Sequence, residues 1–143
     1  MATDATGPGF AVARLDHVVL RVRDLERSID FYERVLGCSV DRRRPELGLV
    51  HLRAGASMID LVAVDGPLGR PGGPAAGDAG RNMDHVCLRV DPFDGAAILA
   101  HLRRHDAARS TEVQMNYGAE GHGPSLYLGD PDGNVVELKG PPA

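Results

Sequence analysis

Two histidines and two carboxylates of this 143-residue chain have the types and placement of a metal site. His17 and His85 stand at the same place in two similar segments, 15–22 and 83–90, which share Asp-His-Val near their starts and Leu-Arg-Val at their ends. Glu137 lies in the last apolar segment of the chain. Two imidazoles and one carboxylate would supply N, N and O ligands to a divalent ion at about 2.0 to 2.2 Å and leave positions open for water and substrate. We therefore predict that His17, His85 and Glu137 bind one metal ion.

Asp60 is a fourth candidate ligand. It occupies in the first half of the chain the place that Glu137 has in the second half. Its side chain is one carbon shorter, so it would either bind the metal directly or orient one of the imidazoles by a hydrogen bond. The sequence leaves both possibilities open.

The elements that must hold these residues are also repeated. A helical pattern follows each of the two similar segments, which indicates that the chain consists of two copies of one module. In the first copy, residues 15–22 form a strand and Asp24 caps a helix whose apolar residues recur at helical spacing. Three shorter strands are predicted next, at residues 39–42, 47–53 and 57–64. The first module, residues 13–64, is therefore predicted to be βαβββ.

A stretch rich in glycine and proline, residues 65–82, separates the modules and is predicted to be a linker. The second module, residues 83–140, repeats the order of the first. It has a strand at 83–90 and a helix capped by Asp91, with Pro92 at the first helical position. Its later strands are predicted at residues 112–116, 125–128 and 134–139.

Alternation along the strands predicts which side chains meet. The aliphatic face of each sheet turns toward its helix, so the opposite face is polar in both modules. The polar face carries His17, Val19, Arg21, His51, Met58, Asp60, Val62, His85, Cys87, Arg89, Ser125, Tyr127, Val135, Glu137 and Lys139. A carboxylate on the inner side of a sheet costs several kcal/mol unless it is paired, hydrogen-bonded or bound to a metal. We therefore expect the functional cluster on one concave, polar side.

Further side chains on this polar side are candidates to assist a reaction. Tyr127 could donate a proton or a hydrogen bond, His51 could act as an acid or base, and Glu137 could take a catalytic role besides binding metal. Possible partners for an anion are Arg21, Arg89 and Lys139. The glycine-rich segment 118–124 is predicted to be a mobile loop that could close over the site as a lid.

Two other polar clusters are predicted to lie outside the site. His101 and His105 stand four residues apart on a predicted helix, but the glutamate of an HExxH zinc motif is absent, so they are interpreted as a solvated helix face. The run Arg42-Arg43-Arg44 is interpreted as the solvated end of a strand.

Composition excludes several classes of protein. The net charge of −4, with both signs interspersed, argues against a nucleic-acid partner. No apolar run approaches the roughly 20 residues that span a bilayer, and Met1–Gly9 is unlike a signal peptide. Cys38 and Cys87 are isolated, as is usual for reduced thiols. We expect a cytoplasmic protein with no membrane partner, whose residues 1–12 form a flexible tail.

At these residues the chain resembles the glyoxalase I, fosfomycin-resistance and extradiol dioxygenase superfamily, also called vicinal oxygen chelate (VOC) proteins. The resemblance covers about residues 13–140. It rests on Leu15-Asp16-His17, Phe31-Tyr32, Leu36-Gly37, Asp84-His85 and the segment 127–138, Tyr-Leu-Gly-Asp-Pro-Asp-Gly-Asn-Val-Val-Glu-Leu. It implies a single α+β domain in which two βαβββ modules pair into an open, curved, barrel-like sheet around one divalent metal, held by His17, His85 and Glu137. The chain departs from the glyoxalase I pattern at Asp60, where that pattern has Glu.

The resemblance also implies an enzyme. Such a protein would chelate a small substrate through neighbouring oxygens on one divalent ion (Fe, Mn, Ni, Zn or Co) and stabilise an enediolate, alkoxide or catecholate. A glyoxalase-like lyase or isomerase and an extradiol-type dioxygenase are the two favoured activities. The alternatives are a metal-free binding protein of the bleomycin-resistance type, a fosfomycin-type thiol transferase, and a relative that binds metal without chemistry. We expect a homodimer, in which the two modules of one chain pair with each other or are exchanged between chains.

Overall fold

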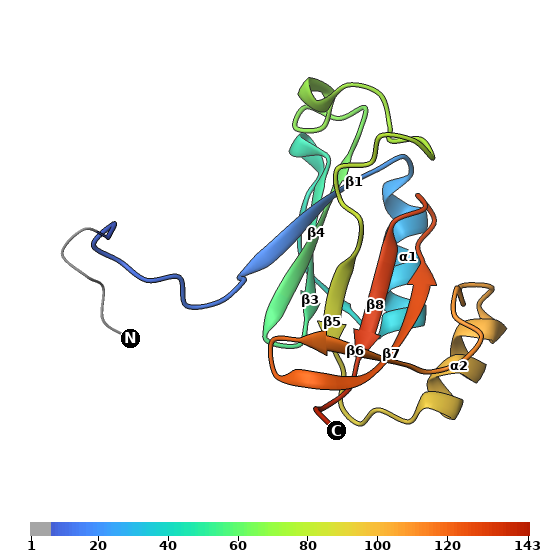
Figure 1. Cartoon of the computed structure of the whole chain (residues 1–143). Helices are drawn as coiled ribbons and strands as arrows, with labels where there is room; N and C mark the ends of the chain where they lie inside the picture. The colour runs from blue at the N-terminus through green and yellow to red at the C-terminus, as the bar shows by residue number, and fades with distance from the viewer. Residues whose placement is uncertain (1–6) are drawn as a thin grey trace.

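Two four-stranded mixed sheets and two helices make up the computed structural model, which describes residues 7–143 (Figure 1). One sheet has the order β1-β4-β3-β2 and the other β5-β8-β7-β6, and the pairs β1·β4 and β5·β8 are parallel. The elements are β1 (His17–Val22), α1 (Leu25–Leu36), β2 (Ser39–Arg44), η1 (Pro45–Leu47), β3 (Leu49–Ala54), β4 (Ser57–Ala63), η2 (Arg70–Gly72), β5 (Val86–Arg89), α2 (Gly95–Arg104), β6 (Gln114–Gly118), β7 (Gly121–Gly129) and β8 (Val135–Lys139). The α+β fold of two βαβββ modules is confirmed, and the sheets stay open.

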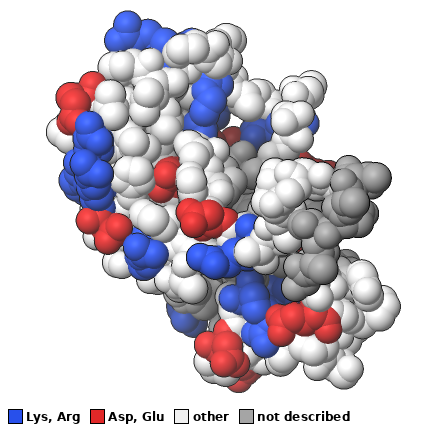
Figure 2. All heavy atoms as spheres, turned by 90° about the vertical axis from the view of Figure 1, so that its left-hand side faces the viewer, with Lys and Arg blue, Asp and Glu red and all other residues white. Residues whose placement is uncertain are grey.

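The chain before β1 extends away from the two sheets in Figure 1. Residues 7–16 are exposed and contain no helix or strand. The predicted tail 1–12 falls only partly in this segment, since residues 1–6 lie outside the described residues. Within residues 7–143, no helix is long and apolar enough to cross a membrane. Basic and acidic side chains alternate on the face shown in Figure 2.

The first helix forms as predicted, because its ends carry the residues that helix ends require. The Asp24 side chain accepts a hydrogen bond from the Arg27 backbone N–H at 3.0 Å, and Gly37 ends the helix with a φ of 70°. The buried face of α1 consists of Ser28, Ile29, Tyr32 and Val35. This face packs on the first sheet, and Val35 reaches the core of the second module as well.

The second helix begins later than the sequence predicted. Asp91 was expected as its cap and Pro92 as its first residue, but α2 starts at Gly95. Asp94 is the cap, and its side chain accepts a hydrogen bond from the Ala97 backbone N–H at 3.1 Å. The prediction was wrong because two aspartates three residues apart offer the same cap, and Asp94 stands directly before the uninterrupted helix-forming run.

A buried cluster of hydrogen bonds, here called the inter-module clamp, ties α1 to the turn between β7 and β8. The Tyr32 hydroxyl donates to Asp130 Oδ2 at 2.7 Å. Asp132 accepts from the Arg23 backbone N–H at 2.9 Å and from the Ser28 hydroxyl at 3.3 Å. Both aspartates are less than 8% exposed. The clamp and the shared packing of α1 fix how the two modules sit together.

We expect Asp130→Ala to lower the free energy of unfolding by about 3 kcal/mol, because Tyr32 and two backbone N–H groups would lose their acceptor in a buried place. Urea unfolding measures the change. Asp78→Ala, at an exposed position, is the matched control and should stay within about 0.5 kcal/mol of the unchanged protein. Equal stability of the two variants would show that the clamp does not hold the modules.

A second prediction concerns pH. Burial raises the pKa of the Cys38 thiol from 9.0 to about 11. The unfolded chain therefore loses this proton first, so the free energy of unfolding should fall as pH rises from 9 to 11, while below pH 9 this thiol should have no effect. Cys38→Ala should make the decline shallower in urea unfolding at several pH values. Identical slopes for the two proteins would contradict this.

Candidate metal site

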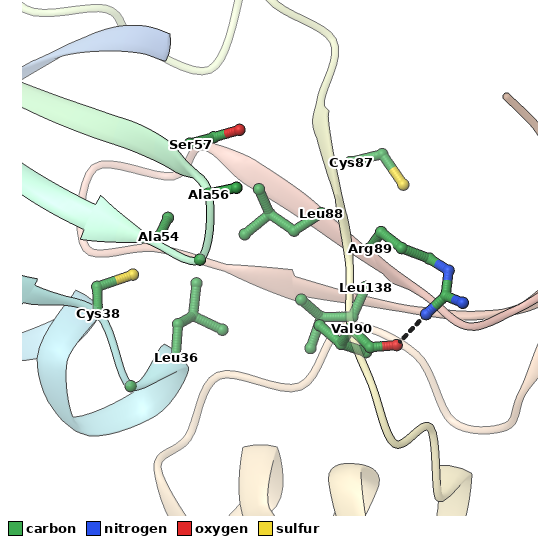
Figure 3. Close-up of a pocket in the computed structure, with 12 residues that line it drawn as sticks. Leu36, Cys38, Ala54, Ala56, Ser57, Cys87, Leu88, Arg89, Val90 and Leu138 are labelled. Carbon is green, nitrogen blue, oxygen red and sulfur yellow. Dashed lines mark hydrogen bonds between the residues drawn. The ribbon is translucent and has the colours of Figure 1, made fainter. Parts of the chain in front are cut away.

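The uncovered face of each sheet carries the polar side chains that alternation predicted. Figure 3 shows the alternation on β5, where Leu88 points toward Ala54 and Ala56 while Cys87 and Arg89 point the other way. On β8, Val136 and Leu138 lie in the core beside α1, which leaves Glu137 on the opposite side. The pocket in Figure 3 has a volume of about 340 Å³ and lies between the modules.

The first module holds one histidine–carboxylate group. The Asp60 carboxylate is 5% exposed, and His17 Nε2 lies 4.0 Å from its Oδ2. His51 Nδ1 lies 3.0 Å from Oδ1 but outside hydrogen-bond geometry. Among the described residues, this buried oxygen therefore has no hydrogen-bond partner. A buried carboxylate oxygen without a donor is a position where a cation would be stabilised.

The second module holds the corresponding group. His85 Nε2 lies 3.1 Å from Glu137 Oε1, and the Tyr127 hydroxyl donates to the same oxygen at 3.3 Å. Asn116 Nδ2 lies 3.5 Å from Glu137 Oε2 and donates to the Ser125 hydroxyl at 2.7 Å. Burial first, and then the charge of Glu137, raise the pKa of the Tyr127 phenol. Tyr127 therefore remains a hydrogen-bond donor at neutral pH.

An aspartate holds the other ring nitrogen of each histidine. Asp16 Oδ1 accepts from His17 Nδ1 at 2.8 Å, and Asp84 Oδ1 accepts from His85 Nδ1 at 2.6 Å. The hydrogen bond to Asp16 raises the pKa of His17. Such a hydrogen bond fixes the ring and leaves Nε2 directed at the neighbouring carboxylate, as in histidines that bind metals. The sequence contained this signal as the repeated Asp-His pair, but the role of the aspartates was not predicted.

Strand register makes the two groups equivalent. His51 is the cross-strand partner of Asp60, and Tyr127 is the cross-strand partner of Glu137. His51 thus occupies in the first module the place that Tyr127 has in the second. Asn116 on β6 was not predicted as a site residue, although it lies among the side chains of the polar face.

Within the described residues, one chain does not bring all the predicted ligands together. Its structure pairs His17 with Asp60 and His85 with Glu137, but no three His, Cys, Asp or Glu side chains between residues 7 and 143 are arranged to hold a single ion. The reason is that the modules contact each other through α1 and the helix-facing cores, while their polar faces are not closed on each other. A metal role for these residues stays a prediction.

The three predicted anion partners have different surroundings. Arg21 donates to the backbone carbonyls of Gly69 and Gly73 and so fastens the linker. Arg89 pairs with Glu120, with 2.8 Å between Nε and Oε1. Lys139 is buried, and its Nζ has no hydrogen-bond partner in the described part of the chain. Of the three, Arg21 thus has a structural role, and its part in anion binding stays a prediction.

The predicted lid is a β-hairpin. Residues 118–124 were expected to form a mobile loop, but Tyr117 pairs with His122 and Gly118 with Gly121, which leaves a two-residue turn. Glycine is a weak strand former, so composition alone suggested a loop. The C-terminal segment adds further backbone bonds to β7, including one from Gly140 to the Pro124 carbonyl at 2.8 Å.

His101 and His105 are not simply a solvated face. His101 Nε2 lies 2.8 Å from the Val35 carbonyl oxygen, so this ring links α2 to α1. The two imidazoles stack edge to face, with 4.7 Å between ring centroids. They serve packing between the modules and lie apart from the carboxylates of the candidate site.

The donors present suit a divalent metal ion. The described residues offer two imidazole Nε2 atoms and two buried carboxylates, and within them the Asp60 Oδ1 atom has no hydrogen-bond donor. Mixed nitrogen and oxygen donors of this kind suit Fe, Mn, Co, Ni or Zn. His17, His85, Glu137 and Asp60 are thus the residues that could hold such an ion.

Two open sheets built from duplicated βαβββ modules, with a histidine and a buried carboxylate on the polar face of each, define the class of this protein. Residues 14–138 match the family described as the Glyoxalase/Bleomycin resistance protein/Dioxygenase superfamily, and the chain belongs to that superfamily.

Similar proteins include enzymes of two kinds. The chain is 31% identical to human mitochondrial methylmalonyl-CoA epimerase over 94% of this chain and 77% of the relative. It is 32% identical to Escherichia coli O157:H7 lactoylglutathione lyase over 87% of this chain and 90% of the relative. The crystal structure of virulence protein STM3117 from Salmonella typhimurium superposes with a TM-score of 0.74 at 26% identity, covering 92% of this chain and 99% of the other.

We expect Asp84→Asn to weaken the binding of Co(II) by about 10- to 100-fold, because the ring of His85 would lose the carboxylate that orients it. Calorimetric titration of metal-free protein measures the affinity. Asp78→Asn, away from the site, is the control. Unchanged affinity in Asp84→Asn would show that this aspartate does not orient a ligand.

Proposed function

We propose that this protein is a divalent-metal-dependent isomerase or lyase that moves a proton on a carbon beside a carbonyl group of a small substrate, which binds through neighbouring oxygens. One observation carries the proposal: in each module, an aspartate holds Nδ1 of a histidine whose Nε2 faces a buried carboxylate. The two relatives named an epimerase and a lyase support the reaction class.

The proposed ligands are His17, His85 and Glu137, with Asp60 as a fourth ligand or as the residue that orients His17. A divalent ion held by them would act as a Lewis acid and stabilise negative charge that develops on the substrate oxygens. The buried Oδ1 of Asp60, which has no hydrogen-bond partner among residues 7–143, favours direct binding by this carboxylate.

The remaining side chains would handle the proton. Glu137 lies where it can accept a proton from the substrate carbon and return it. Tyr127 keeps its own proton at neutral pH and can donate a hydrogen bond to Glu137 or to the substrate. Asn116 holds Glu137 and Tyr127 in place through its amide. His51 is the second acid–base candidate because it lies beside Asp60.

We propose that the two halves of the site meet in a homodimer, in which His17 and Asp60 of one chain face His85 and Glu137 of the partner subunit. Large apolar side chains beside both halves support this arrangement. Leu15 and Val19 flank His17 and are 86% and 48% exposed, while Met115 and Tyr117 on β6 are 55% and 77% exposed. A two-fold axis would cover all four and form two equal sites.

Subunit mixing tests this arrangement. His17→Ala and His85→Ala should each lose tight Co(II) binding, and His105→Ala, which lies on the far side of the second module next to α2, should keep it. When the two inactive variants exchange subunits, half of the dimers are mixed and each has one intact site, so about a quarter of the sites should recover metal. Recovery confirms a site shared between chains. No recovery after demonstrated exchange would place the whole site within one chain.

Proton exchange tests the reaction class. We expect the Co(II)-loaded protein to exchange the hydrogen beside the carbonyl of methylmalonyl-CoA or S-lactoylglutathione with D2O, followed by NMR. Glu137→Gln should slow this exchange by about 10²- to 10⁴-fold, because the base is removed. Tyr127→Phe should slow it less. If neither compound exchanges, while Fe(II)-loaded protein consumes oxygen with a catechol, the dioxygenase alternative replaces this proposal.

A further inference from the structure

Lys139 is the only lysine in the chain, and the other 15 of its 16 basic residues are arginines. It is the last residue of β8, two positions after Glu137, and it lies on the same face of the strand. Its side chain is 7% exposed, and within residues 7–143 its Nζ has no hydrogen-bond partner. A buried ammonium without a partner costs several kcal/mol, so this position requires an explanation.

Two glycines make the room for this side chain. A Cβ atom at Gly118 would lie 2.6 Å from Lys139 Cε, and one at Gly123 would lie 2.9 Å from Nζ. A side chain at either position of the β6–β7 hairpin would therefore displace the end of Lys139 from the place that it occupies. The hairpin that composition suggested as a lid is therefore part of the wall around Lys139.

Lys139 lines a pocket that also contains the proposed metal ligands of the second module. This pocket, of about 270 Å³, is lined by His85, Cys87, Arg89, Tyr117, Gly118, Ala119, Glu120, Glu137 and Lys139. Arg89 is the cross-strand partner of Lys139, and Cys87 is that of Glu137. The two cations therefore lie two residues, or about 6.6 Å, along the strands from Glu137.

The charged side chains that line this pocket are two cations and two carboxylates, but they are not all paired with one another. Arg89 is neutralised by Glu120, with 2.8 Å between Nε and Oε1. Glu137 is engaged by His85 and Tyr127. The ammonium of Lys139 is left without a hydrogen-bond partner in the described part of the chain, although it lines the same pocket.

We propose that Lys139, assisted by Arg89, forms a binding site for a carboxylate group of the substrate. A buried ammonium without a partner among the described residues, beside the guanidinium of its cross-strand neighbour, suits a small anion such as a carboxylate. Its distance along the strands from Glu137 would place that carboxylate a few bonds from the carbon that reacts. The assignment of the anion to a substrate rests on the proposed function, whereas the anion site itself depends only on the residues of this pocket.

Because the chain has a single lysine, protein labelled with [ζ-15N]lysine gives one side-chain ammonium signal to follow by NMR. We expect acetate to shift this signal saturably at millimolar concentration in metal-free protein, at constant ionic strength. The neutral analogue acetamide should have no effect. Inorganic phosphate should bind more weakly than acetate, and preferential phosphate binding would overturn the choice of a carboxylate.

Thermal unfolding of variants completes the test. Acetate should raise the Tm of the unchanged protein and of Arg104→Met, an exposed position with the same change of charge. It should not raise the Tm of Lys139→Met.

Without acetate, Lys139→Met should be at least as stable as the unchanged protein, because an unpaired buried charge is removed. A strongly destabilised Lys139→Met variant, or no acetate effect on the unchanged protein, would overturn the proposal. If acetate has these effects but the protein does not bind Co(II), the anion site is supported and only the proposed metal site is contradicted.

Discussion

Two buried carboxylates on the uncovered sides of the sheets constrain the rest of this structure. Asp60 and Glu137 are each 5% exposed, although each lies on the face of its sheet that the helix does not cover. Charged groups at such positions cost free energy unless they have partners. The fold supplies an imidazole to each from the start of the adjacent parallel strand, His17 in β1 or His85 directly before β5, and an aspartate holds the other nitrogen of that imidazole. The polar faces are therefore built around charge and not around packing.

The opposite faces of the two sheets contribute the apolar packing that the polar faces lack. Each sheet packs its aliphatic side on a helix, and α1 contributes to the cores of both modules. The clamp adds hydrogen bonds from Tyr32 and Ser28 to two further buried aspartates, Asp130 and Asp132. Because the modules are joined through their helical sides, the polar faces remain open to a ligand or to a second chain.

Local features of this architecture could be predicted from the sequence, whereas the relative placement of distant groups could not. Strand alternation correctly placed Glu137 opposite Val136 and Leu138, and the Asp24 cap and Gly37 stop fixed α1. The start of α2 was mistaken because two aspartates compete for one cap. The hairpin around residues 118–124 was missed because two sets of backbone hydrogen bonds hold it, those between β6 and β7 and those between β7 and the C-terminal segment. A glycine-rich sequence does not indicate such pairing. Alternation also cannot tell whether two polar faces of one chain close on each other. That depends on the contacts of α1 with both cores.

The two halves of the site have diverged in a way that divides their roles. In the second module, Glu137 accepts hydrogen bonds from Tyr127 and Asn116, and the network is closed and fixed in position. In the first module, Asp60 is shorter, its cross-strand partner is His51, and one buried oxygen has no donor among the described residues. The carboxylate of the second module is thus held by hydrogen bonds, while a buried oxygen of the first would be stabilised by a cation. Duplication thus supplied two similar scaffolds, and the residues at positions 51, 60, 127 and 137 give their carboxylates different hydrogen-bond partners.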